Sequence, residues 1–133
     1  MKIIDGKDVI MGRLASYVAK ESLKGEEIAV VNCEQIIISG NKKDIEKKFH
    51  EKRTKVGSGQ RGPKHSRTNE KVVKRIIRGM IPNHRRGRGK EALQRIKCYV
   101  GVPKEFVDVK KITTGKNNPL KYLRIGEIQK WIK

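Results

Sequence analysis

An uninterrupted apolar run constrains the fold of this 133-residue chain more than any other feature. The segment "IAVV" at residues 28–31 has the length of a strand, and its side chains do not alternate between apolar and polar. A strand with one face in water alternates, whereas a strand covered on both faces, as in a parallel sheet, does not. The run therefore predicts a buried strand at residues 28–32.

Other segments supply the remaining elements of an α/β fold. Short apolar runs predict strands at 2–5, in "QIIISG" and in "IKCYVG". Helical spacing predicts helices over 12–25, 41–55, 69–80, 89–96 and 119–132, the last with Ile128, Trp131 and Ile132 on its apolar face. In the first helix, Leu14 and Val18 mark the core face and Glu21 faces away. The alternation of strands and helices favours an α/β layer with a small parallel sheet, and the length fits one domain over residues 1–133.

The charge of the chain is large and uneven. It has 33 Lys and Arg against 14 Asp and Glu, a formal net charge of +19. Residues 42–97 carry 20 basic and 5 acidic residues, a net of +15, which leaves +4 for the other 77 residues. Charge of this size destabilises a compact chain unless an anionic partner neutralises it. We therefore expect a polyanion to bind the middle of the chain.

Two basic segments combine fixed charge with small residues. Between residues 54 and 68, "TKVGSGQRGPKHSRT" holds one apolar residue, Val56, so it is expected to be an exposed loop or a tail that orders on a partner. "RGMIPNHRRGRG" at 78–89 repeats the combination of arginine and glycine. Glycine lets a backbone approach a phosphate closely, and the arginine fork binds phosphate oxygens in bidentate geometry.

The composition favours structured RNA as the polyanion. Aromatic residues make up only 5% of the chain, which is few for a protein that reads single strands by stacking. No zinc finger, basic zipper or helix-turn-helix spacing indicates a reader of duplex DNA. Charge alone would also suit an anionic membrane or heparin surface, but a long glycine-interrupted loop fits a folded RNA groove better.

Catalysis has no positive signal in the sequence. "GSGQRG" at 57–62 matches GxGxxG, but a charged helix precedes it and Pro63 follows, so we do not expect a dinucleotide site. The histidines lack ligand partners at metal spacing, and the carboxylates are scattered, so no metal, cofactor or small-molecule substrate is expected. Cys33 and Cys98 are expected to be free thiols. We find no signal peptide and no membrane-length apolar run, which indicates a cytoplasmic protein.

Two other hypotheses stay open on these residues. The buried strand and the GxGxxG match would suit a nucleotide-using enzyme, which would bind a mononucleotide saturably. The charge would also suit a free-standing binder of nucleic acid or of an anionic surface, which would stay outside any large particle.

Longer motifs resemble a known family. "IIDGKDVIMGRLASYVAK" and "VVNCEQIIISGN", then "RGPKHSR" and "RIIRGMIPNHRRGRGKEALQRIKCYVGVP", are similar to the universal large-subunit ribosomal protein 13 family in its archaeal form, over about residues 3–106. The resemblance implies a three-layer α/β/α domain around a four-stranded parallel sheet. It also implies a structural, non-enzymatic role on large-subunit ribosomal RNA, beside neighbouring ribosomal proteins, and support of subunit assembly.

The resemblance also implies which residues face RNA. In the loop they are Arg61, Gly62, Lys64, His65 and Arg67, and in the signature region Arg78, Gly79, His84, Arg85, Arg86 and Arg88. By charge alone we add the basic residues of the second helix and its end: Lys42, Lys43, Lys47, Lys48, Lys52, Arg53 and Lys55. Met80 and Ile81 are expected to pack and fix the turn. Replacing Arg85, Arg86 and Arg88 with alanine is expected to weaken RNA binding and leave the fold intact.

Overall fold

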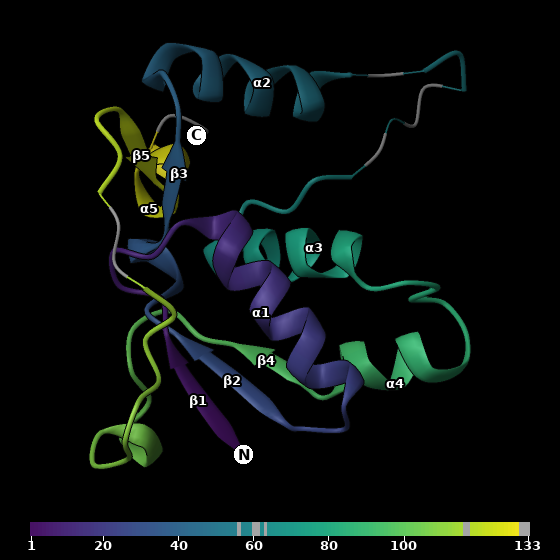
Figure 1. Ribbon diagram of the computed structural model, residues 1–133. Helices are drawn as coiled ribbons and strands as arrows, with labels where there is room; N and C mark the ends of the chain where they lie inside the picture. Colours follow the sequence, from purple (N-terminus) through teal and green to yellow (C-terminus); the bar gives the residue numbers. More distant parts are fainter. Residues whose placement is uncertain (56, 60–61, 63, 116–117, 131–133) are drawn as a thin grey trace.

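A parallel sheet forms the centre of the protein, as a computed structural model shows (Figure 1). The structure describes residues 1–55, 57–59, 62, 64–115 and 118–130. Strands β1 (Lys2–Asp5), β2 (Ile28–Val31) and β4 (Ile96–Cys98) pair in parallel in the order β1-β2-β4. Every residue of β2 is buried, which confirms the central strand predicted from its uninterrupted apolar run.

Beside β1 a single bridge extends the sheet, and the strand predicted in "QIIISG" lies outside this sheet. Ile112 lies parallel to Ile4, donating to the Ile3 carbonyl at 2.8 Å and accepting from the Asp5 amide at 3.0 Å. The ladder goes no further along the described residues, so the sheet has three strands. The mixed α/β class was predicted correctly, whereas the four-stranded sheet was not.

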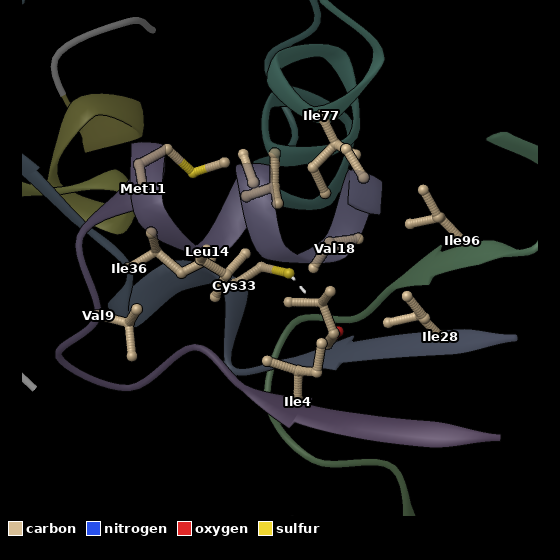
Figure 2. Packing of buried hydrophobic residues seen from close by; sticks show 14 of the residues in the cluster. Ile4, Val9, Met11, Leu14, Val18, Ile28, Cys33, Ile36, Ile77 and Ile96 are labelled. Carbon is tan, nitrogen blue, oxygen red and sulfur yellow. Dashed lines mark hydrogen bonds between the residues drawn. The ribbon is translucent and has the colours of Figure 1, made fainter. Parts of the chain in front are cut away.

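Helices cover one face of this sheet. They are α1 (Met11–Leu23), α3 (Asn69–Met80) and α4 (Gly87–Gln94), and α1 contacts both others. Figure 2 shows Leu14 and Val18 of α1 above Ile4 and Ile28 of the strands, with Ile77 of α3 behind; all five side chains are buried. The helical periodicity therefore identified the main core correctly.

The other face of the sheet is covered differently from the predicted three-layer arrangement. Ile3, Ala29 and Val31 pack there against Tyr99 and Phe106. Phe106 ends a single 3-10 turn, η2 (Lys104–Phe106), so irregular chain covers this face where the resemblance implied a layer of helices.

A second, smaller cluster forms around an antiparallel strand pair. Strand β3 (Ile37–Ser39) pairs with β5 (Tyr122–Arg124), and α2 (Lys42–Thr54) and α5 (Ile125–Lys130) pack beside them. The cluster consists of Ile45, Leu123 and Ile128, with Ile38 and Phe49 at its edge. The sequence predicted helix throughout 119–132, so β5 is a correction; Trp131 and Ile132 lie outside the described residues.

Glu21 is a second correction. It was expected to face solvent, but it is 7% exposed and accepts hydrogen bonds at 2.6 Å from both Lys2 Nζ and Lys24 Nζ. The hydrogen bonds from Lys2 and Lys24 lower the pKa of Glu21 to about 2. Cys33 and Cys98 are free, as predicted. None of the helices in the described ranges is long and apolar enough to cross a bilayer.

Candidate nucleic-acid interface

Helix α2 presents a basic surface because so few of its residues are apolar. Ile45 is buried and Phe49 is half-buried against the β3–β5 cluster, and these two fix the orientation of the helix. The five lysines of the helix are all exposed: Lys42, Lys43, Lys47, Lys48 and Lys52. One of these lysines is paired, since Lys42 Nζ lies 3.8 Å from a carboxylate oxygen of Glu127 in α5.

Between α2 and α3, residues 57–59 lie away from the core and residues 64–68 lead back to it (Figure 1). Residues 57–59 are exposed, as expected, whereas Gly62, His65 and Ser66 are half-buried. Arg53 Nη2 donates to the Ser66 carbonyl at 3.0 Å, and Arg75 Nη1 donates to the Lys64 carbonyl at 2.8 Å. The returning part of the loop is therefore fixed to both helices by guanidinium groups.

Two further expectations concern this loop. The GxGxxG match follows helix α2 and not a strand, which agrees with its rejection as a dinucleotide site. Lys55, Lys64 and Arg67 are exposed, so they are available to a partner. Arg61 lies outside the described residues.

A pocket of about 250 Å³ lies between α2, α3 and residues 65–66, and we call it the α2–α3 pocket. Phe49 of α2 and Val72 and Ile76 of α3 give it an apolar lining. No carboxylate is found among the described residues that line it. An apolar pocket of this kind suits a flat ring better than a hydrated ion.

Basic side chains surround the same pocket: Lys52, Arg53, His65 and Arg75. Burial, together with the nearby charges of Arg75 and Lys52, lowers the pKa of His65. Burial and the neighbouring Arg67 lower the pKa of Arg53. The pocket therefore favours an anionic group, which would relieve the repulsion among these cations.

Helix α3 adds basic residues that the sequence analysis did not select. A hollow of about 260 Å³ joins Lys64 of the loop to Arg78, with Lys71 and Lys74 between them. A further hollow of about 280 Å³ includes Lys71, Lys74 and Lys97. The two lysines look like the ordinary solvent face of an amphipathic helix in the sequence, and only the fold places them between the loop and the signature region.

The turn between α3 and α4 projects its own basic side chains. Arg85 and Arg86 are exposed, His84 is half-buried, and Gly79 is exposed at the end of α3. Asn83 has a left-handed φ of 48°, a conformation that Asn tolerates better than most residues.

Of the two packing residues predicted beside this turn, only one packs. Ile81 is 4% exposed, as expected, because it enters the main core. Met80 is 43% exposed, so its prediction as a packing residue is wrong. Met80 lies at the last position of α3, where the chain turns toward α4.

Two residues of the signature region have structural roles. A Cβ on Gly89 would lie 2.1 Å from the Pro82 carbonyl oxygen, so this glycine permits α4 to pack on the turn. Arg88 Nε and Nη2 donate to the Leu23 carbonyl at 3.1 and 2.7 Å, at the last residue of α1. In the triple alanine variant, the loss of Arg88 is therefore expected to lower stability as well as to remove charge.

The family model of ribosomal protein L13 matches residues 1–105. The chain belongs to this family. It is 44% identical over 133 residues to "Large ribosomal subunit protein uL13" of Methanocaldococcus jannaschii, covering 98% of this chain and 96% of that protein. The proteins of the same name from Methanococcus maripaludis and Methanosarcina barkeri are 41% and 42% identical, and each comparison covers at least 94% of both chains.

Membership of the L13 family confirms the resemblance and excludes the enzyme hypothesis, because this is a family of ribosomal structural proteins. The matched range contains α2, the loop, α3, the α3–α4 turn and α4, which together carry all the predicted RNA-facing residues. Strand β5 and α5 lie beyond residue 105, yet the archaeal relatives align over nearly the whole chain.

Proposed function

We propose that this L13 protein is a structural constituent of the large ribosomal subunit, where it binds large-subunit rRNA and supports subunit assembly. The observation that carries the proposal is a family match of residues 1–105 together with a net charge of +15 between residues 42 and 97. In this proposal residues 1–133 act as one ribosomal-protein domain in the cytoplasm, with 54–68 as its RNA-binding loop.

The proposed mechanism is phosphate neutralisation on two surfaces. The first contains α2 and the loop, with these contacts: Lys42, Lys43, Lys47, Lys48, Lys52, Arg53, Lys55, Arg61, Gly62, Lys64, His65 and Arg67. The second is the signature region, with Arg78, Gly79, His84, Arg85, Arg86 and Arg88. The guanidinium of Arg88 also donates hydrogen bonds to the Leu23 carbonyl. Lys71 and Lys74 line the hollows between the two surfaces and extend the proposed set.

Neighbouring ribosomal proteins are the second class of proposed partner. Val100, Val107 and Val109 are each about half exposed, at 54, 56 and 46%. They belong to the irregular chain over the face of the sheet that carries no helices. Exposed apolar side chains close together in sequence suit a protein contact better than a phosphate contact.

The salt dependence of binding tests the mechanism. Each neutralised phosphate contributes about 0.7–0.9 to the slope of log affinity against log salt concentration. Replacing Arg85 and Arg86 with alanine should therefore reduce the slope for large-subunit rRNA by about 1.4–1.8.

The matched control removes the same charge elsewhere. Lys104 and Lys110 are exposed, and the segment that carries them lies at the opposite side of the protein from the α3–α4 turn (Figure 1). Their double alanine variant should keep the wild-type slope, because charges beyond about 10 Å are screened at 0.1 M salt. A wild-type affinity that does not change with salt would refute the mechanism.

A further inference from the structure

The α2–α3 pocket has a composition that phosphate binding alone does not require. Phosphate contacts need exposed cations, yet here an apolar lining lies beneath the cations. Its volume of about 250 Å³ exceeds the roughly 150 Å³ in which a protein cavity holds benzene, so a nucleobase can enter it.

Phe49 is the only aromatic residue in the basic part of the chain, residues 42–97. It is half-buried, with one side against the β3–β5 cluster and another in the pocket. Val72 and Ile76 face it from α3. Aromatic side chains bind unpaired bases by stacking, whatever the base, because every base has a π-face.

Arg53 supplies donors for the charged part of a nucleotide. It uses Nη2 to hold the Ser66 carbonyl at 3.0 Å, while Nε and Nη1 are buried without a hydrogen-bond partner in the described part of the chain. Buried donors without partners are costly, particularly on a charged group. An oxygen of a phosphate group would accept from either donor in a charge-assisted hydrogen bond.

The loop fixes the other side of the pocket. Arg75 holds the Lys64 carbonyl and Arg53 holds that of Ser66, so His65 lies between two anchored residues. Burial and the surrounding cations lower its pKa, which favours the neutral imidazole. A neutral imidazole can both donate a hydrogen bond to a base edge and accept one from it.

We propose that the α2–α3 pocket receives one unpaired nucleotide of the bound RNA, with its base on Phe49 and a flanking phosphate on Arg53. The proposal rests on the proposed rRNA binding and adds to it a site for a flipped-out nucleotide. An unpaired RNA nucleotide combines a flat ring with a phosphate group and the polyanion expected beside it.

The two phenylalanines of the chain provide a matched test. Phe49→Leu keeps an apolar side chain against the β3–β5 cluster but removes the ring. Phe106→Leu makes the same change on the other side of the sheet, where Phe106 packs edge to face on Tyr99 at 5.8 Å between ring centroids. The full-length variants are compared by filter binding to large-subunit rRNA over a salt series, with circular dichroism as the check on folding.

We expect Phe49→Leu to weaken rRNA binding by about fivefold or more, the lower range of one lost base stack, with the salt slope unchanged. Phe106→Leu should bind as the wild type does. Equal affinity of Phe49→Leu and the wild type for rRNA would overturn the pocket proposal. A loss of affinity in Arg53→Gln but not in Phe49→Leu would also overturn it, because it would indicate a phosphate site without a base.

A second variant and the binding of the wild-type protein separate the possible outcomes. If Phe49→Leu does not fold, Val72→Phe fills the pocket from α3 without changing the charge and should cause the same loss; unchanged binding by a folded Val72→Phe would overturn the proposal. Failure of the proposed function is a different result, because the wild-type protein itself would then not bind rRNA.

Discussion

Replacing Gly89 with alanine tests how tightly α4 is packed on the preceding turn. The new Cβ would lie 2.1 Å from the Pro82 carbonyl oxygen and 2.6 Å from that of Asn83. Real Cβ contacts are almost never shorter than 3.0 Å, so the two backbones must separate by at least 0.9 Å, the difference between 3.0 and 2.1 Å. Backbone atoms cannot rotate out of the way as a long side chain can.

Overpacking of this kind costs about 1–3 kcal/mol of folding free energy. With a urea slope of about 1.5 kcal/mol per molar, the unfolding midpoint should fall by about 0.7–2 M. The measurement is urea unfolding followed by circular dichroism, with an unchanged slope as the sign that only stability has changed.

Gly79→Ala is the matched control. A Cβ on Gly79 meets no atom within 4 Å, and the residue is exposed in α3. Alanine is a better helix former than glycine, so this variant should be as stable as the wild type or up to about 1 kcal/mol more stable. If Gly89→Ala unfolded at the wild-type midpoint, the close contact between α4 and the turn would be refuted.

Two more predictions concern stability. Arg88→Ala should lower the free energy of unfolding by up to about 1 kcal/mol, because the hydrogen bonds to the Leu23 carbonyl are lost. Arg85→Ala should stay within about 0.5 kcal/mol of the wild type. Equal urea midpoints for the two variants would contradict the anchoring role of Arg88. Because the folded pKa of Glu21 is lowered to about 2, its contribution to stability is present above about pH 4.5 and is lost as the pH falls toward 2. Glu21→Gln should therefore flatten the fall in the urea midpoint between pH 5 and 2, and a variant with the wild-type pH profile would show that the carboxylate is not paired in solution.

The elements predicted well from the sequence are those with a strong local pattern. The apolar run of β2 and the helical stripes of α1 and α3 each contain enough residues to determine both the element and its buried face. Strand β5 was missed because it has three residues and pairs with β3, more than 80 positions away in the chain. No local pattern can indicate that contact.

The candidate nucleic-acid interface could also be predicted only where the sequence pattern is local. Charge and glycine content predicted which segments are basic and exposed, and α2 and the α3–α4 turn agree with this. The sequence could not predict that Arg88 reaches a carbonyl 65 residues away, or that Glu21 is held by Lys2. The α2–α3 pocket was also not predictable, because Phe49 and Val72 come together only when two helices pack.

The most direct test of the central claim is sucrose-gradient fractionation of a cell lysate at low and then moderately high salt, with detection of this chain. A large-subunit constituent held by many phosphate contacts should co-migrate with the large subunit under both conditions. A chain found only in the light fractions at both salt concentrations would contradict the assignment and would leave a free-standing binder of nucleic acid as the alternative.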